Sequence, residues 1–573
     1  MGGSNTLLFI NGHIYINLNM KDLTKDYPEL NERALGWLNF LYLKATTSDD
    51  WTEDGEPHEW WDRSSTPPMC SFPRFDLQES TYALGLMADK TPAWREVYSE
   101  ILEEIAERSI TYWAAVDWLS QFGEDPGRSE YPQEWKGTLI PEEFWGHYDA
   151  PGWTANGVDP WGMQPDPIGA DGNLFFKGWL NLTQALHTYV SGEDKWANTF
   201  SLAGVNRSRF EWTQHQLVDH LYKQWTKTPM GPHCENTKAW PFCLSAAGLG
   251  LKMYDNVFGK ESHSAYHNWL DFTKNKYYGF DKKGNIEWVT MYYDAIKEHH
   301  HKTDPTMGLA ISFYAIPQAP EFAESLYRGA VNFLKWNDPS ADLVSLGDPR
   351  MMALGLTISK EFDDQITYER LRKHAEENFE PRYFGFKDSQ FGFWFNLGEN
   401  WPRGQLSALA VCAEVCEEGS WKKLFNEPNF SKYSSPYIEG VDFPSVAIKQ
   451  AWHDDEKGIL VFHMIDGDSS KTGLETTIHI SNIPNPNDIE VLCDGLPFDQ
   501  YSIVDSTSIE IRADIKSHVF LCKTGYYLSK EAKAKIRPNF STQSQKITKG
   551  NFKKKGTNSK LLMPNLARSC NCC

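Results

Sequence analysis

Hydrophobic residues recur at helical spacing through most of the first 420 positions of the chain. In residues 31–47, for example, Leu35, Leu38 and Tyr42 fall on one face. An apolar residue every third or fourth position predicts an amphipathic helix that buries one side. The same pattern predicts further helices at 76–90, 92–108, 207–226, 243–257, 261–275, 318–336, 366–378 and 404–418.

A further helix is predicted between residues 172 and 192. Phe175, Trp179, Leu182 and Leu186 follow one another at offsets that keep them on one helix face. Gly192 then provides a helix stop, because glycine adopts the left-handed conformation that often ends a helix. The helix–loop–helix units differ in length, so the body is mostly helical without a repeat of fixed period.

The pattern changes near Pro436 to an alternation with a period of two, bounded by Asp-Gly and Pro-Asn turns, which predicts antiparallel strands. We therefore expect four segments. They are an N-terminal strand and linker at 1–30, a helical catalytic domain at 31–434, a small antiparallel β-sandwich at 435–527 and a disordered basic tail at 528–573.

Cys234 and Cys243 lie nine positions apart in a proline-bounded segment that also contains Trp240. Pro232 and Pro241 disfavour regular helix between the two cysteines, and helical spacing resumes after Cys243. One thiol is therefore expected on a loop and the other at a helix start, where the helix dipole favours thiolate. The alternative is that both thiols are small buried hydrophobes, as free cysteines usually are.

Composition narrows the class of protein. The 573 residues carry a net charge of −21, which makes nucleic acid an unfavourable partner. Aromatic residues make up 14% of the chain, with 23 Trp, a bias that suits pockets for apolar or sugar ligands. The sequence shows neither an apolar run long enough for a membrane span nor a secretory signal, so we expect a cytoplasmic protein.

The two ends of the chain suggest lipid attachment. Gly2 begins a pattern for myristoylation, and the chain ends in SCNCC, where Cys572 and Cys573 are candidates for a second lipid. Two lipid signals together can hold a protein stably on a membrane surface. This predicts a possible association with the cytosolic face of a membrane.

The helical body resembles the linalool dehydratase/isomerase family. The resemblance is carried by NLFFKGWLNL at 173–182, by Cys234 and Cys243, by SAAGLGLKMYDNVFG at 245–259 and by NWLDF at 268–272. It implies an (α/α)6 barrel that acts on terpene alcohols, and it leaves open a homo-oligomeric ring. The strand-rich segment and the tail lie outside it.

The resemblance also implies site residues. The cysteines at the positions of Cys234 and Cys243 line the family's substrate pocket, and Glu235 would orient them. A methionine and a histidine of the family are replaced here by Phe175 and Trp179. The family's aspartate position falls on Tyr42, so that Asp76 would have to supply a carboxylate from nearby; Trp240 would complete the wall of the pocket.

From these residues we expect a terpenoid-modifying lyase, isomerase or cyclase of specialised metabolism, acting on an apolar polyene or alcohol without a cofactor. A dehydration needs a group that protonates the leaving hydroxyl and a base that takes a proton from carbon. Because indole cannot titrate, a pericyclase of the Diels–Alderase type, which needs no acid or base, is the closest alternative.

Two alternatives come from other classes. A carbohydrate-active enzyme would need paired carboxylates, for which Asp166 with Asp171 and Glu142 with Glu143 are candidates. A non-catalytic lipid-binding protein would hold a terpenoid without turnover. No metal site is predicted, because the segment from Asp363 lacks the last acid of an aspartate-rich motif, and residues 299–301 are expected in a solvated loop.

Overall fold

The structure is a computed structural model of the chain. It describes residues 24–62, 73–116, 164–204, 207–234, 238–282, 284–295, 298–538 and 540, and also the backbone of four short strands, β1 (Leu7–Ile10), β2 (His13–Ile16), β3 (Ser65–Thr66) and β4 (Met69–Cys70). Of the described residues, 46% are helical, and a sheet region follows towards the C-terminus. The predicted change from helices to strands near Pro436 is therefore confirmed.

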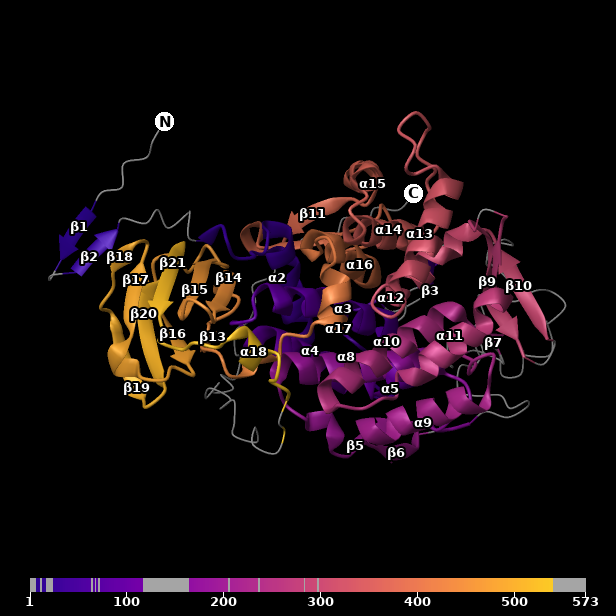
Figure 1. The fold of residues 1–573 in the computed structure, drawn as a ribbon, viewed down its shortest axis with the longest axis horizontal. Helices are drawn as coiled ribbons and strands as arrows, with labels where there is room; N and C mark the ends of the chain where they lie inside the picture. Colours follow the sequence, from indigo (N-terminus) through magenta and orange to yellow (C-terminus); the bar gives the residue numbers. More distant parts are fainter. Residues whose placement is uncertain are drawn as a thin grey trace, which may run out of the picture.

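Within the described part of the chain, a set of helices contact one another in a closed ring (Figure 1). In order around the ring they are α3 (Pro73–Lys90), α8 (Leu174–Ser191), α10 (Pro241–Phe258), α12 (Gly308–Ala315), α14 (Pro349–Glu361) and α16 (Gly404–Val415), and α16 returns to α3. Every residue of α8 and of α12 is buried. A helix that is buried all round belongs inside a larger core, as these helices do.

Other helices cover the outside of this ring. They are α2 (Glu32–Thr46), α4 (Glu96–Ser109), α5 (Tyr112–Ala115), α9 (Gln214–Lys227), α11 (Ser264–Tyr277), α13 (Pro320–Leu334), α15 (Gln365–Asn378) and α17 (Ser420–Asn426). In α4, the predicted apolar stripe of Val97, Ile101 and Ile105 is buried. These outer helices are amphipathic, which is why their periodicity was visible in the sequence.

Most predicted helices are confirmed, with differences of a few residues at their ends. Gly192 ends α8 in the left-handed conformation, as expected. The helix predicted at 207–226 is shorter, because β6 (Arg209–Trp212) precedes it and Thr213 caps the N-terminus of α9. The solvated loop expected at 299–301 is wrong: these histidines begin β10 (His299–Thr303), which pairs with β9 (Ile286–Asp294).

The remaining short strands of the helical part form small antiparallel pairs or additions to β9. They are β5 (Phe200–Ala203), which pairs with β6, β7 (Lys238–Ala239), β8 (Tyr278–Phe280), β11 (Pro381–Phe384) and β12 (Gln390–Phe393). None of the described helices is long and apolar enough to cross a membrane.

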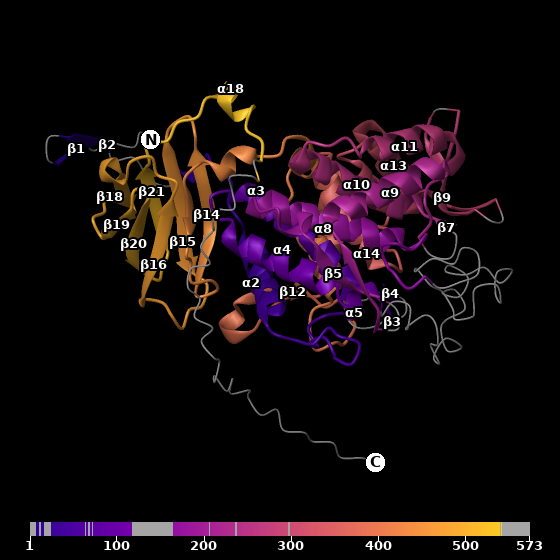
Figure 2. The same cartoon turned by 90° about the horizontal axis from the view of Figure 1, so that it is seen from below.

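The C-terminal region contains two antiparallel sheets, seen beside the helical part in Figure 2. One sheet has the order β13 (Tyr437–Glu439), β16 (Glu475–Ser481), β20 (Ser508–Asp514) and β19 (Tyr501–Asp505). The other has the order β14 (Val446–Asp454), β15 (Ile459–Asp466), β21 (His518–Lys523), β17 (Glu490–Cys493) and β18 (Leu496–Pro497). A short helix, α18 (Lys530–Lys533), follows.

Alternating burial explains why these strands could be predicted. In β16 every second residue is buried, and Ile478 lies opposite Ile511 of β20. Phe462 of β15 likewise lies opposite Phe520 of β21. A strand with one face towards a core shows this period of two.

The sheet region is joined to the helical part by hydrogen bonds. The Ile438 backbone N–H donates to the Ala93 carbonyl at 2.8 Å, and the Leu30 N–H donates to the Lys449 carbonyl at 2.8 Å. Because the two parts share backbone hydrogen bonds, they are held in a fixed relation at this junction.

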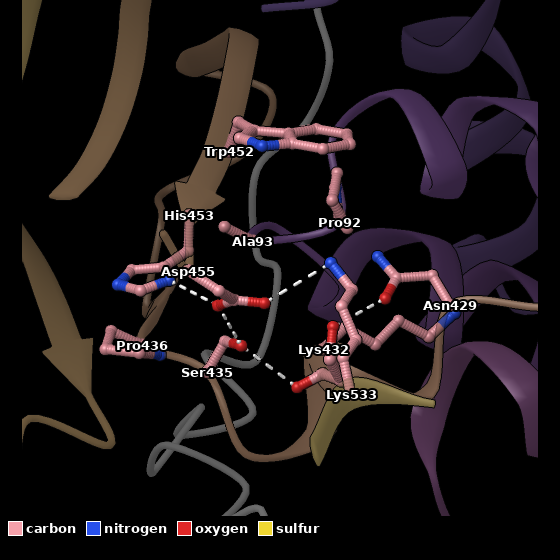
Figure 3. Close-up of a pocket in the computed structure, with 11 residues that line it drawn as sticks. Pro92, Ala93, Asn429, Lys432, Ser435, Pro436, Trp452, His453, Asp455 and Lys533 are labelled. Atoms are coloured by element: carbon pink, nitrogen blue, oxygen red, sulfur yellow. Dashed lines mark hydrogen bonds and ion pairs between the residues drawn. The ribbon is translucent and has the colours of Figure 1, made fainter. Parts of the chain in front are cut away.

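A polar network lies at the same junction, and we call Ser435, His453, Asp455, Thr524 and Lys533 the junction network; Figure 3 shows all of them except Thr524. All are buried except Lys533, which is exposed at its edge. His453 Nδ1 and Ser435 Oγ each lie 2.7 Å from Asp455 Oδ1, and Lys533 Nζ is 3.3 Å from Asp455 Oδ2. His453 Nε2 lies 2.9 Å from Thr524 Oγ1. The adjoining cavity has only about 10 Å³, about enough for one water molecule.

Candidate active site

The two cysteines lie at the N-terminal ends of neighbouring ring helices. Cys243 is in the first turn of α10, and Cys234 lies in the loop that contacts the start of α8. The Phe175 backbone N–H donates to Cys234 Sγ at 3.1 Å, and both thiols are buried. The expectation of one thiol on a loop and one at a helix start is therefore confirmed.

Lys177 adds positive charge near Cys234. Its ammonium donates to the Ala170 carbonyl at 2.7 Å and to Gln224 Oε1 at 2.9 Å. Burial lowers the pKa of Lys177 to about 7, and the Cys234 thiol opposes that shift electrostatically. A backbone N–H donor together with a nearby cation favours the thiolate form of a cysteine.

Aromatic rings from four helices, α3, α8, α10 and α12, meet beside the cysteines. Phe175 stacks on Trp179 with ring centroids 3.6 Å apart, and the Phe75 ring of α3 lies 4.6 Å from Phe175. Phe242, next to Cys243, lies 5.6 Å from Trp179 and 5.4 Å from Tyr314. The rings form a continuous and largely buried aromatic cluster between α3, α8, α10 and α12.

A chain of hydrogen bonds runs from Trp179 to a buried carboxyl group. The Trp179 indole N–H donates to the Tyr82 hydroxyl, which lies 3.0 Å from the Tyr314 hydroxyl. The Tyr314 hydroxyl donates to Glu79 Oε1 at 3.4 Å, and Gln405 Nε2 donates to Glu79 Oε2 at 2.8 Å. We call Glu79, Tyr82, Trp179, Tyr314 and Gln405 the ring chain, because they come from α3, α8, α12 and α16.

Burial makes Glu79 a poised acid. It raises the pKa of Glu79 to about 7, although the hydrogen bond from Gln405 and the charge of Arg350 oppose the shift. Burial likewise holds the pKa values of Tyr82 and Tyr314 well above their usual range, and Cys243 adds to the effect on Tyr314. Near pH 7 the carboxyl group of Glu79 can therefore both give and accept a proton.

A second buried carboxyl group lies one turn earlier on α3. Asp76 pairs with Lys44 at 2.6 Å and accepts the Asp62 backbone N–H at 3.0 Å. Burial raises the pKa of Asp76 to about 6, while the Lys44 ammonium opposes the shift. Asp62 in turn accepts the first amides of α16, from Gly404 at 2.8 Å and Gln405 at 2.9 Å.

Two oxygens of this region are buried without a hydrogen-bond partner among the described residues. They are Asp76 Oδ1 and Gln405 Oε1. Buried polar atoms are nearly always paired, so such oxygens indicate a place for water or for a polar group of a ligand. Asp62 also lines an open hollow of about 320 Å³ whose walls include Trp61 and Trp401.

The other predicted site residues are not brought into this group. Tyr42 lies on the outer helix α2 and meets Phe443 of the sheet region with centroids 5.0 Å apart. Trp240 caps α10 and packs on Tyr292 of β9 at 5.0 Å. Glu235 and the lipidation candidates Gly2, Cys572 and Cys573 lie outside the described residues.

Sequence reasoning missed Glu79, Tyr82, Tyr314 and Gln405. A signal for Glu79 exists in α3, because acidic residues at 76 and 79 fall three apart in a helix that is buried on nearly all sides. A charged residue in such a helix must be paired or functional. For Tyr314 and Gln405 the signal is absent, because only the closed ring brings α12 and α16 to α3.

Comparison with known proteins finds a family match for part of the chain. Residues 142–385 match the family model of linalool dehydratase/isomerase. The matched region contains both cysteines, Trp179 and Tyr314, whereas Glu79 of α3 lies before it and Gln405 of α16 after it.

Two solved structures show weak likeness. Endoglucanase CelQ from Clostridium thermocellum, complexed with cellotriose, is 10% identical, with 86% of this chain and 92% of that chain covered and a TM-score of 0.31. Ara127N-Se, a GH127 β-L-arabinofuranosidase from Geobacillus stearothermophilus T6, is 11% identical, with 89% and 77% covered and a TM-score of 0.21. TM-scores this low do not establish a shared fold.

Proposed function

We propose that this protein, whose residues 142–385 match the family model of linalool dehydratase/isomerase, is a terpenoid-modifying lyase or isomerase built on an (α/α)6 barrel. The closed ring of α3, α8, α10, α12, α14 and α16 supports the barrel. Its C-terminal sheets are proposed as a β-sandwich with a structural role. The substrate class is an apolar polyene or alcohol of specialised metabolism, and the site needs no cofactor.

The observation that carries this proposal is that aromatic rings and a buried carboxyl group meet at the centre of the helix ring. One side presents the stacked rings of Phe175 and Trp179, which suit a hydrocarbon. The other side holds the Glu79 carboxyl group, with the unpaired oxygens of Asp76 and Gln405 in the same polar region. A ligand that satisfies both sides is an apolar molecule with one hydroxyl group.

The proposed dehydration begins at Glu79. The Glu79 carboxyl group gives its proton to the substrate hydroxyl while the carbon–oxygen bond breaks, and water leaves. The allylic cation that remains is stabilised by the faces of Phe175 and Trp179, an attraction of about 2 kcal/mol when desolvated. In isomerisation, water adds to the other end of the same cation, and the new hydroxyl group returns its extra proton to the Glu79 carboxylate.

A base completes the elimination, and we assign this role to the Cys234 thiolate. The Phe175 N–H and the Lys177 charge favour its ionised form. The thiolate takes a proton from the carbon beside the cation, which gives the alkene, and proton transfer back to Glu79 resets the site. Cys243 lies beside Tyr314 and shapes the acid end, and Glu235 is proposed to orient the adjacent Cys234.

The experiment is product analysis with linalool and with longer prenyl alcohols and polyenes, using the full chain. We expect dehydrated or isomerised product, and Cys234→Ser should lower turnover by about 10²-fold because the general base is lost. Cys522→Ser, which replaces a buried thiol in β21 of the sheet region, is the matched control and should leave turnover unchanged.

The same variants separate the alternatives. A pericyclase would retain most of its rate when Cys234 and Cys243 are both replaced, and it would accept a polyene without a hydroxyl group. A lipid-binding protein would release every compound unchanged. A carbohydrate-active enzyme is disfavoured by its described candidates, because Asp166 accepts a hydrogen bond from Trp212 of β6 and Asp171 accepts one from Gln164.

We also propose that the enzyme acts at the cytosolic face of a membrane, held by lipids at Gly2 and at Cys572 or Cys573. An anchored enzyme would meet its apolar substrate where that substrate accumulates. Intact-mass measurement of the protein from its native cells tests this idea. Masses that correspond to an unmodified Gly2 and unmodified terminal cysteines would contradict it.

A further inference from the structure

A compact group of potential metal ligands lies in the sheet region, apart from the ring chain. Cys493 ends β17, Asp494 follows it in the turn, and His518 begins β21. Their donor atoms, Cys493 Sγ, an Asp494 carboxylate oxygen and a His518 ring nitrogen, all lie within 4.8 Å of one another. Among the described residues, this group has the ligand types that zinc prefers.

The separations between these donor atoms fit a tetrahedral zinc ion. Ordinary zinc–ligand bond lengths place sulfur about 3.6 Å from nitrogen or oxygen in a tetrahedron, and nitrogen about 3.3 Å from oxygen. Here Cys493 Sγ lies 3.4 Å from His518 Nδ1 and 3.7 Å from Asp494 Oδ2. His518 Nδ1 lies 2.8 Å from Asp494 Oδ2, so these two atoms would separate by about half an ångström on binding.

The backbone holds the Asp494 ligand in position. Asp494 has a left-handed φ of 52°, and its N–H donates to the Val519 carbonyl at 2.9 Å. Val519 N–H in turn donates to Asp494 Oδ1 at 2.9 Å. One carboxylate oxygen is thus occupied by the strand, which leaves Oδ2 directed towards Cys493 and His518.

Asp514 holds the His518 ring from its other side. Its Oδ1 lies 2.9 Å from His518 Nε2, and its Oδ2 pairs with Lys516 at 2.9 Å. A histidine whose Nε2–H is held by a carboxylate presents the lone pair of Nδ1 towards a metal. This arrangement of carboxylate, imidazole and open ligand atoms is common around protein-bound zinc.

We propose that Cys493, Asp494 and His518 bind one Zn²⁺ ion, with Asp514 as a positioning residue. A thiolate and an imidazole disfavour Mg²⁺ and Ca²⁺, which take oxygen ligands. Three protein ligands leave a fourth position for water, and the exposed side of Asp494 gives the ion access from solvent. The bound ion ties the turn after β17 to the start of β21.

Binding displaces one proton from the site. Zinc binds cysteine as the thiolate, so the Cys493 thiol has to lose its proton when the ion binds. As the zinc–sulfur bond forms, the sulfur–hydrogen bond breaks and the proton passes to solvent. No electron transfer is involved.

The test is titration of the chelator-treated full chain with CoCl₂, followed by displacement with ZnCl₂. A background variant with Cys570→Ser, Cys572→Ser and Cys573→Ser removes the tail thiols from the measurement. Tetrahedral cobalt bound to thiolate should give intense visible d–d bands and a sulfur-to-cobalt charge-transfer band, at one cobalt per chain. ZnCl₂ should abolish both bands and raise the melting temperature of the chain.

Matched variants assign the ligands. In the background variant, Cys493→Ser should remove the charge-transfer band, and Asp514→Asn should weaken cobalt binding by about 10–100-fold while it leaves that band in place. Asp499→Asn, an exposed carboxylate a few residues away, should change nothing. Far-ultraviolet circular dichroism establishes that each variant is folded, and Asp494→Asn, at an exposed position, provides an independent ligand variant.

Two results would overturn the proposal. One is cobalt spectra without a charge-transfer band in the background variant, which would mean that the three groups form only a hydrogen-bonded cluster. The other is the same band at the same strength after Cys493→Ser, which would place the thiolate ligand elsewhere. Neither result touches the proposed terpenoid chemistry, because the ring chain does not include these residues.

Discussion

Two buried polar networks, the ring chain and the junction network, have opposite effects on the carboxyl group at their centre. Burial raises the pKa of Glu79 in the ring chain to about 7. Burial would also raise the pKa of Asp455 in the junction network, but hydrogen bonds from His453 and Ser435 hold it below its ordinary value. The first carboxyl group is poised to transfer a proton, and the second is a fixed anion.

The difference comes from the donors around each carboxyl group. Glu79 accepts one short hydrogen bond, from Gln405 at 2.8 Å, and a long one from Tyr314 at 3.4 Å. Asp455 accepts two contacts at 2.7 Å and is also paired with Lys533. A charged carboxylate needs donors to offset its lost hydration, so the network with fewer donors keeps its proton. The sparse network is therefore the candidate for chemistry.

The largest expected effect is the loss of turnover when Glu79 of the ring chain is replaced. Glu79→Gln retains a polar amide but cannot give a proton, so turnover should fall by about 10³-fold, which corresponds to about 4 kcal/mol in the barrier. Turnover is measured on the prenyl alcohol that gives product with the unaltered enzyme. If Glu79→Gln kept more than a tenth of the rate, the acid would have to be another group.

Glu361→Gln is the matched control for this variant. Burial raises the pKa of Glu361 to about 7 as well, but this carboxylate accepts the backbone amides of Trp421 and Lys422, both at 2.9 Å. Its replacement should lower stability and leave turnover within twofold. A large loss of turnover would show that any buried acid of the ring matters in this way.

The pH dependence should have opposite signs in the two networks. The folded-state pKa of Glu79 is raised from 4.5 to about 7, so its contribution to stability is full below pH 4.5 and is lost as the pH rises through about 7. The loss is about 3 kcal/mol at most. Asp455, with its lowered pKa, contributes above its unfolded value of 3.8 and loses that contribution as the pH falls.

Urea unfolding from pH 2 to pH 9 measures both effects, because the contribution of Asp455 is lost only below its unfolded pKa of 3.8. The difference between the unaltered chain and Glu79→Gln should appear between about pH 4.5 and pH 7, and kcat should decline above about pH 7 as Glu79 ionises. A kcat that stayed constant from pH 6 to pH 9 would contradict a protonated Glu79 as the acid.

Asp455→Asn should affect stability alone. It removes the charge that pairs with Lys533 and weakens the contacts of His453 and Ser435, so unfolding should require about 2 kcal/mol less free energy. Urea denaturation measures the loss, and turnover at 25 °C should stay within twofold. Reduced turnover in the folded variant would mean that the junction network also controls the ring.

The sequence predicted many of the helices and strands that carry these networks, but it did not predict which of their side chains meet. The outer helices and the strands after Pro436 have one buried face, so their periodicity was visible. The inner helices α12 and α14 were missed. In α12 nearly every residue is apolar, so no polar face produces a periodic pattern, whereas α8, which is also buried throughout, keeps enough polar residues to show one. Cys234, Cys243 and Trp179 could be found through family resemblance. Tyr314 and Gln405 could not, since only ring closure brings them to Glu79.

The smallest expected effect comes from the indole of Trp179. Trp179→Phe keeps an aromatic face against Phe175 but removes the N–H that donates to Tyr82. Losing one hydrogen bond of the ring chain should cost about 1 kcal/mol, and we expect kcat to fall about fivefold with little change in KM.

Trp336→Phe is the control, because that buried indole donates to the Val344 carbonyl at 2.9 Å, outside the ring chain. It should lower the free energy of unfolding by a similar amount without changing kcat. If the two variants behaved alike in both measurements, Trp179 would be a packing residue, and the ring chain would begin at Tyr82.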